Sequence, residues 1–330
     1  MTPGRRIAVV SDIHYASPGE TARAGFEQRV ITSPLLRWLA RQYRHHLWMR
    51  DPLVHNHLID QFLAHAADAD AVVANGDYSC DSAFVGVSDP AACESARICL
   101  ERLRTAFPDR TRSVLGDHEL GKMSLFGGQG GPRLASWRVA VDTLRLEPFW
   151  RWEWDRFVLF GVTSTLLALP VFEPEILPEE RAEWRALREQ HLDDIRANLR
   201  ALATDQRIVL FCHDPTALPF LWREGVVRAC IDRIALTIIG HLHTPLVFRL
   251  SRILAGMPRV RFLGNTARRL SEALHQARLW RPFRVRLCPS LAGCELLKDG
   301  GFGWLELDPA SAGTARLKTT SIPATPVSSL

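Results

Sequence analysis

The chain has 330 residues, 47% of them hydrophobic and 23% charged, which excludes a disulfide-stapled peptide and a chain that is disordered throughout. Its 41 basic and 36 acidic residues leave a formal net charge of +5, too small by itself to indicate a nucleic-acid partner. No apolar run approaches the roughly 18 residues of a membrane-spanning helix, and the apolar run at residues 7–10 is too short for a signal-peptide core, so we expect a cytoplasmic protein.

Five short apolar runs are the strongest indications of strands in this sequence. They cover residues 6–10, 71–74, 113–115, 208–212 and 235–239. Each run ends in Gly, Asp, Asn or His, as strands buried on both faces do when polar loops leave their carboxyl ends. Residues 90–107 and 178–202 show helical periodicity between the runs. The alternation predicts an α/β protein whose functional loops follow the strands.

The last third of the chain has a different pattern. Its predicted strands are residues 245–250, 259–263, 283–287 and 303–307, with one helix at residues 266–277. This pattern indicates a second, partly antiparallel sheet. Residues 309–330 are rich in Ala, Ser, Thr and Pro and are predicted to form a flexible tail.

The candidate functional residues follow the five apolar runs. They are Asp12 and His14; Asp77; Asp117, His118 and Glu119; His213; and His241 and His243. Residues two apart in a strand point to the same side, so Asp12 with His14, and His241 with His243, can each offer two ligands together. Carboxylates and imidazoles without a thiolate favour Mn, Fe, Zn, Ni or Co. Two such ions can hold a phosphoryl group and activate a water, so the pattern predicts phosphoester hydrolysis.

In chain order these blocks contain D-x-H, G-D, G-D-H-E, an isolated His and G-H-x-H. They resemble the motifs of the calcineurin-like metallophosphoesterases, whose third block usually has Asn where this chain has Asp117. The resemblance implies a four-layer α/β/β/α sandwich of two mixed sheets flanked by helices. It also implies a single domain over residues 1–308, with a helical insertion after the first strand at about residues 20–66.

The resemblance further implies a role for each candidate residue. The metal ligands would be Asp12, His14 and His243 for one ion, His213, His241 and Asp117 for the other, and Asp77 as the bridge. His118 would be the catalytic histidine that stabilises the phosphoryl transition state, and Glu119 would orient it. We expect two divalent ions, Mn before Fe, Zn, Ni, Co or Mg. Because Asp117 adds a negative charge at the usual Asn position, we expect an altered metal preference with activity retained.

Residues 34–50 form a basic amphipathic segment within the insertion. As a helix, this segment has an apolar stripe of Leu36, Leu39, Tyr43 and Leu47, with arginines largely elsewhere. A second arginine-rich stretch covers residues 249–286. Such segments bind anionic membrane surfaces, although a helix that packs its apolar stripe on the core is an equal alternative. Some relatives are peripheral membrane pyrophosphatases acting on UDP-2,3-diacylglucosamine, and this insertion resembles theirs.

The predicted function is therefore metal-dependent hydrolysis of a membrane-associated phosphodiester or pyrophosphate, such as a lipid-linked nucleotide, by a cytoplasmic protein peripheral to the inner membrane surface. The alternatives are a soluble small-molecule or nucleotide phosphodiesterase or phosphatase and, less favoured, a nuclease or a non-catalytic scaffold. A nucleic-acid partner is less favoured because the arginines alternate with Leu and Trp. In the Gly-rich segment 121–133, Lys122 and Arg133 are predicted to contact substrate phosphate.

Overall fold

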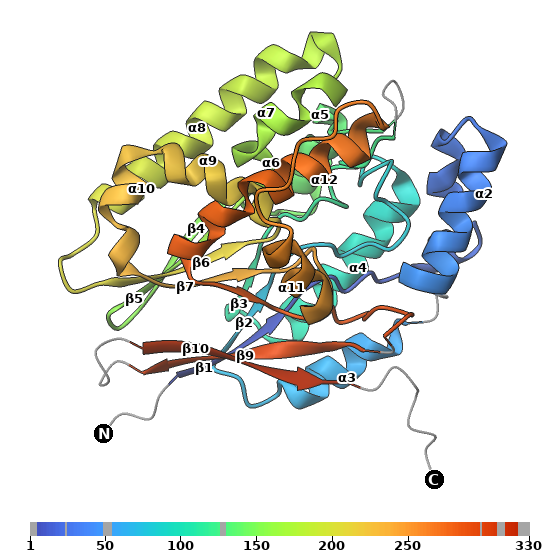
Figure 1. Ribbon diagram of the computed structural model, residues 1–330. Helices are drawn as coiled ribbons and strands as arrows, with labels where there is room; N and C mark the ends of the chain where they lie inside the picture. Colours follow the sequence, from blue (N-terminus) through green and yellow to red (C-terminus); the bar gives the residue numbers. More distant parts are fainter. Residues whose placement is uncertain are drawn as a thin grey trace.

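The computed structural model describes residues 5–23, 25–48, 55–125, 130–297, 299–308 and 314–322 (Figure 1). The strands are β1 (Arg5–Val10), β2 (Ala71–Ala74), β3 (Thr111–Ser113), β4 (Phe149–Trp154), β5 (Phe157–Val162), β6 (Arg207–Cys212), β7 (Ile234–Ile239), β8 (Val285–Leu287), β9 (Gly301–Asp308) and β10 (Thr314–Ser321). The α-helices are α1 (Pro18–Thr21), α2 (Pro34–Tyr43), α3 (His57–His65), α4 (Pro90–Ala106), α5 (Leu134–Arg138), α6 (Ser164–Leu167), α7 (Leu169–Phe172), α8 (Arg181–Arg200), α9 (Leu218–Arg223), α10 (Gly225–Ala229), α11 (Pro245–Ile253) and α12 (Gly264–Gln276).

The strands form two mixed sheets of five strands each. Their orders are β10-β9-β1-β2-β3 and β4-β5-β6-β7-β8. In the first sheet β1, β2 and β3 are parallel, while β9 and β10 run antiparallel to their neighbours. In the second sheet β5 to β8 are parallel and β4 is antiparallel. The carboxyl ends of the parallel strands within each sheet therefore meet at one edge.

Successive side chains of the buried strands point to opposite faces of each sheet, so a separate apolar cluster lies between each pair of neighbouring layers. Ile7 and Val9 of β1 contribute to the cluster between the two sheets, together with Phe211 of β6. Ala8 and Val10, which point the opposite way, belong to the cluster that contains apolar residues of α3 and α4. The outer face of the second sheet packs on α8 and α9 (Figure 1). The predicted four-layer α/β/β/α architecture is confirmed.

Several local predictions were wrong. Residues 245–250 form the start of helix α11 and not a strand, because the Thr244 hydroxyl accepts the Val247 N–H and Pro245 fits the first helical turn. Residues 259–263 form no strand. The β4–β5 hairpin was not predicted, and Thr314–Ser321 forms strand β10 within the stretch expected to be a flexible tail. The backbone of β10 pairs with β9 along its whole length, and the amino-acid composition of the segment does not reveal such pairing.

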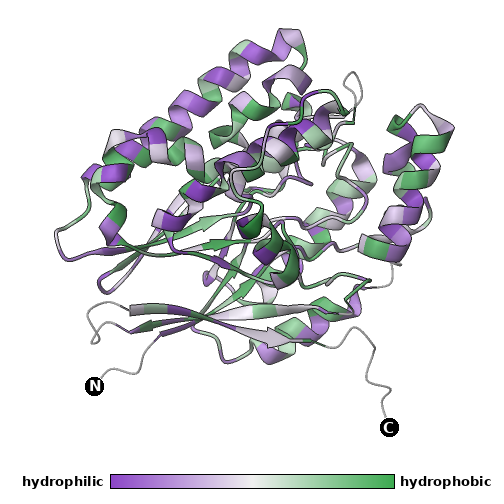
Figure 2. Cartoon of the chain, viewed as in Figure 1, coloured by the Kyte–Doolittle hydropathy of each residue, from purple (hydrophilic) through white to green (hydrophobic). Residues whose placement is uncertain are grey.

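Helices occupy most of the described chain between β1 and β2, in the region where the insertion was expected. This region contains α1, the turn η1 (Phe26–Val30), α2, the π-helical turn η2 (Arg44–Trp48) and α3. Helix α2 lies apart from both sheets, and it carries hydrophobic residues nevertheless (Figure 2). Among the residues that the structure describes, no helix is long and apolar enough to cross a membrane.

Candidate metal centre

The loops that follow β1, β2, β3, β6 and β7 converge on one site. Backbone hydrogen bonds join them directly: the Asp12 N–H donates to Gly76 O, and the Gly240 N–H donates to His213 O, both at 3.0 Å. Gly116 has no room for a side chain, because a Cβ there would overlap the Asp77 carboxylate. The close approach of these backbones brings together side chains that are far apart in the sequence.

Backbone strain is concentrated at the same site. Nine residues other than glycine have a positive φ in the described chain, and five of them are Asp12, His14, Asp77, His241 and His243, with φ from 50° to 61°. This conformation is costly for a residue with a Cβ and persists only where the surroundings enforce it. The fold therefore holds these five side chains in fixed orientations.

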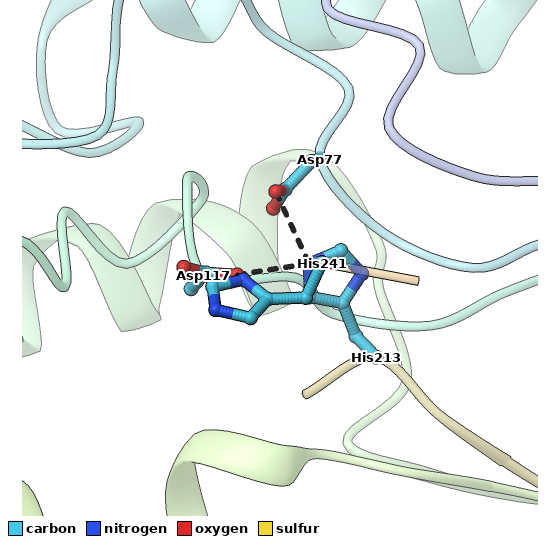
Figure 3. Close-up of side chains that lie close together, drawn as sticks. All are labelled: Asp77, Asp117, His213 and His241. Carbon is cyan, nitrogen blue, oxygen red and sulfur yellow. Dashed lines mark hydrogen bonds and ion pairs between the residues drawn. The ribbon is translucent and has the colours of Figure 1, made fainter. Parts of the chain in front are cut away.

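Asp77, Asp117, His213 and His241 form the first group of donor atoms, all within 4.8 Å of one another (Figure 3). His213 Nε2 lies 3.1 Å from Asp77 Oδ2 and 2.8 Å from Asp117 Oδ1. His241 Nδ1 lies 3.0 Å from Asp117 Oδ1. Asp12, His14 and His243 form a second group, in which Asp12 Oδ1 lies 3.1 Å from His243 Nε2.

Asp77 lies between the two groups. Its carboxylate also belongs to a third set of close donor atoms, with His14 and His118. The sequence-predicted bridging residue is therefore near both clusters, and all seven predicted metal ligands are brought together.

The protonation pattern of the imidazoles fits a metal cation. His213 Nδ1 lies 2.6 Å from Asn75 O and His14 Nδ1 lies 3.2 Å from Ser79 O; because a carbonyl only accepts, both Nδ1 atoms donate. When such a ring is neutral, the lone pair of its Nε2 is directed into the site. His213 Nε2 is buried and makes no hydrogen bond of acceptable geometry, although two carboxylate oxygens are within 3.1 Å. A cation between these atoms satisfies all of them.

The electrostatics of the metal-free groups agree with this interpretation. Burial raises the pKa of Asp12, but His243 and His213 lower it more, so the Asp12 pKa lies well below its usual range. Burial lowers the pKa of His14 to about 3, which leaves its ring neutral near pH 7. Burial also lowers the pKa of His213, but Asp77 and Asp12 raise it well above its usual value. Without a metal, His213 Nε2 therefore holds a proton beside the carboxylates, and a bound cation would replace that proton.

His118 lies at the edge of the donor clusters and is half-buried. Its ring packs edge-on against His14, with centroids 4.6 Å apart, and its backbone N–H donates to Asp77 Oδ1 at 3.0 Å. His118 Nδ1 is 3.2 Å from Ser82 Oγ, so this hydroxyl orients the ring. Burial lowers the pKa of His118.

Glu119 contacts backbone amides and not the His118 ring. Its carboxylate is fully buried and accepts the N–H groups of Gly116 at 2.9 Å, Asp77 at 3.1 Å and Tyr78 at 2.8 Å. It therefore fixes the loops after β2 and β3 relative to each other. The predicted orientation of His118 is supplied by Ser82, which the sequence did not single out.

The two predicted phosphate-binding residues have other partners. Lys122 is buried, with Nζ 3.0 Å from Asp117 Oδ2 and 2.7 Å from Asp214 Oδ2. Arg133 donates to the carbonyl oxygens of Pro132 and Glu175, at 2.9 and 3.1 Å. Lys122 thus belongs to the surroundings of the metal ligands, whereas Arg133 binds backbone carbonyl groups. Four residues of the Gly-rich segment 121–133, at positions 126–129, lie outside the described residues.

Sequence analysis also missed the support that the insertion gives to the site. The Arg44 guanidinium pairs with Glu27 and with Asp81 Oδ1, the latter at 2.8 Å, and donates to Cys80 O at 3.0 Å. It thereby stabilises the loop that carries Ser79 and Ser82. The Trp48 ring packs on the His243 ring, with centroids 4.3 Å apart. Alternation of apolar and basic residues along 34–50 gave no sign of either contact.

The apolar face of α2 points outward. Arg37 donates to Ile31 O and Arg41 donates to Gln28 Oε1, so the basic side of α2 is bound to the protein. Leu36 is half-buried, while Leu35, Trp38, Leu39, Tyr43 and Leu47 are exposed. The interpretation of α2 as a helix that packs its apolar stripe on the core is therefore wrong.

Exposed large apolar side chains occur in three segments only, within the part of the chain that the structure describes. These segments are residues 35–47, 246–270 and 296–297, and we call them the apolar rim. Trp48 packs on His243, α11 begins two residues after His243, and the Leu296 N–H donates to Leu47 O at 3.3 Å. The apolar rim therefore borders the candidate metal centre.

Comparison with known proteins identifies the family. Residues 5–245 match the family model described as calcineurin-like phosphoesterase. The phosphopantetheinyl hydrolase PptH from Mycobacterium tuberculosis is similar over 74% of this chain and 85% of its own, with 16% identity and a TM-score of 0.35. A metallophosphoesterase from Sphaerobacter thermophilus is similar over 96% and 88%, with 12% identity and a TM-score of 0.34. No curated protein matches the sequence. The family assignment depends on the family model alone.

Proposed function

Because the chain belongs to the calcineurin-like phosphoesterase family of hydrolases, we propose that it cleaves a phosphoester or pyrophosphate bond at a centre of two divalent metal ions. The observation that carries the proposal is the convergence of four carboxylate and imidazole side chains in one group and three in another, with Nε2 of His213 and His14 directed inward. Such ions, when bound, polarise the phosphoryl group and activate a water.

In this proposal the positions of the seven side chains assign each of them to one of the two metal ions or to both. One ion is held by Asp12, His14 and His243, the other by Asp117, His213 and His241, and Asp77 is shared. We propose Mn²⁺ before Fe, Zn, Ni, Co or Mg, because the donors are oxygen and imidazole nitrogen without a thiolate. Ser11 Oγ donates to Asp12 Oδ2 at 2.5 Å and holds that carboxylate in place.

His118 is proposed to act on the substrate directly. Ser82 Oγ occupies its Nδ1 side, which leaves Nε2 for the phosphoryl oxygens or the leaving oxygen. The packing of its ring against His14 keeps this nitrogen beside the donor clusters. The ring therefore stabilises the transition state or delivers a proton without moving.

For the substrate, we propose a phosphodiester or pyrophosphate with a lipid tail, presented by an anionic membrane surface. The apolar rim supplies the contact with lipid, because its exposed leucines and aromatic rings border the site. Between Asp232 and Glu272 the chain has no acidic residue, while Arg249, Arg252 and Arg261 are exposed. A second copy of the chain that docked through the same segment would bring these arginines together without acidic partners, whereas anionic headgroups neutralise them.

The proposed location is the cytoplasmic face of the membrane. All seven cysteines lie among the described residues and none is in a disulfide, which fits a reducing compartment. The UDP-2,3-diacylglucosamine pyrophosphatases, whose insertion the segment 34–50 resembles, act on a substrate of the proposed kind, so this lipid nucleotide is the first to test.

The proposal is tested by hydrolysis of bis-p-nitrophenyl phosphate, p-nitrophenyl phosphate and UDP-2,3-diacylglucosamine, after chelation and readdition of Mn²⁺, Mg²⁺, Zn²⁺, Co²⁺ or Ni²⁺. We expect activity to return with metal, and His118→Ala to lower kcat by about 100-fold or more with its metal content unchanged. His65→Ala is the matched control, because His65 is exposed on α3. A protein that binds the ions and hydrolyses none of the three would contradict the hydrolase and favour a scaffold.

A further inference from the structure

The strongest unexplained feature beside the metal ligands is a buried lysine. Lys122 is 3% exposed, and its ammonium lies between Asp117 and Asp214. The chain has only three lysines, at positions 122, 298 and 318, among 41 basic residues. A buried ammonium is costly unless it is fully paired, so this position has a specific requirement for positive charge.

The two oxygens of Asp117 have different partners. Oδ1 faces His213 Nε2 at 2.8 Å and His241 Nδ1 at 3.0 Å, while Oδ2 is 3.0 Å from Lys122 Nζ. Only Oδ1 is therefore directed at the donor cluster. An asparagine, the usual residue at this position in the family, also offers a single oxygen and carries no charge.

We propose that Lys122 is a positioning residue that compensates the charge of Asp117 and restricts it to one donor oxygen, so that the pair replaces the asparagine of the family. The inference rests on the proposed function, because it concerns the affinity of the same metal centre. It replaces the sequence-based prediction that Lys122 contacts substrate phosphate, since both of its carboxylate partners are internal.

The surrounding structure holds the ammonium in this position. The Asp214 side chain accepts the Thr216 N–H at 2.8 Å through Oδ1, which leaves Oδ2 for Lys122. Arg269 of α12 donates to Lys122 O at 2.8 Å and pairs with Glu175 Oε2 at 2.5 Å. Backbone and side chain of Lys122 are thus both fixed, and a flexible role in substrate capture does not fit.

Charge arithmetic gives the expected direction of each substitution. Lys122→Met leaves the negative charge of Asp117 uncompensated, so divalent cations should bind more tightly and activate water less. Asp117→Asn removes that charge while the ammonium remains, so cations should bind more weakly. The double variant Asp117→Asn with Lys122→Met has the same formal charge as the wild type, and its metal affinity should return close to the wild-type value.

The experiment is calorimetric titration of Mn²⁺ into chelator-treated protein, with kcat and KM for bis-p-nitrophenyl phosphate measured in parallel. We expect shifts of about tenfold in opposite directions for the two single variants and a double variant within about threefold of wild type. Lys122→Arg should retain the wild-type affinity. Lys318→Met is the matched control, because Lys318 is exposed and pairs only with Glu306 at 2.8 Å in the described chain.

An unchanged Mn²⁺ affinity in Lys122→Met, or a higher KM at unchanged affinity, would overturn the inference. A double variant that stays far from wild type would overturn it as well. If Lys122→Met does not fold, Lys122→Gln provides the same test, because its amide still donates to Asp214. A wild-type protein that binds no divalent cation would refute the proposed function itself, which separates the two failures.

Discussion

Replacing Leu35, Leu39 and Leu47 together by serine should abolish the proposed membrane binding without affecting the fold. These leucines are 65%, 46% and 42% exposed, so together they present about one and a half fully exposed leucines to the surroundings. Burial of one leucine side chain is worth about 1.5–3 kcal/mol, so the triple variant loses about 3 kcal/mol of membrane affinity, or roughly 100-fold in the partition coefficient. Because none of the three is in the core, the melting temperature should change little.

The assay is flotation with vesicles of phosphatidylcholine that contain phosphatidylglycerol, compared with vesicles of phosphatidylcholine alone. The wild type should float with the anionic vesicles, less so at high salt because Arg249, Arg252 and Arg261 are screened. Serine at Ala182, Ala186 and Ala197, three exposed positions of α8, is the matched control. Wild-type protein that remains in the unbound fraction, or a triple leucine variant that floats equally well, would refute the reasoning.

Three further predictions concern the core of the site and the fold. Glu119→Gln replaces one of two accepting oxygens by an amide donor that faces a backbone N–H, so the free energy of unfolding should fall by about 1–3 kcal/mol in a urea titration. The Mn²⁺ affinity, measured by calorimetry, should also fall because Asp77 shifts. Glu101→Gln, on the exposed side of α4, should change neither quantity. Burial lowers the pKa of His191 to about 3, whereas the unfolded chain takes up this proton near pH 6.5, so the free energy of unfolding should fall by about 2 kcal/mol between pH 7 and pH 5. His191→Gln, whose amide oxygen can accept the Thr163 N–H, should not show this part of the decrease. Equal decreases in both proteins would contradict the assignment to His191. Trp48→Ala removes the ring that packs on His243, and we expect KM for the proposed lipid substrate to rise by about tenfold with metal content unchanged. A lower metal content would show that Trp48 holds the metal ligand His243 itself.

The sequence by itself determined the family and the architecture, because those depend on local patterns. Short apolar runs that end in Asp, Gly or His mark buried parallel strands and the loops at their carboxyl ends. The five sequence motifs from Asp12 to His243 contain the residues that resemble the family and also the proposed metal-donor atoms. The seven proposed ligands could therefore be named before the distances between them were known. The α11 segment shows where local patterns mislead, because Thr244 and Pro245 signal a helix start that the apolar run concealed.

Only the tertiary structure decided which partner each charged residue has. Lys122 and Asp214 are separated by 92 positions, and Glu119 binds amides of a different loop, so no spacing along the chain indicates either contact. The direction of the apolar face of α2 was likewise open, because a helical stripe is the same whether it faces the core or the solvent. Arg37, Arg41 and Arg44 settle that direction, since their bonds to the protein turn the leucines outward. Side-chain pairing across distant loops is a property of the folded chain, and it is this pairing that sets the charge and the exposed surface of the site.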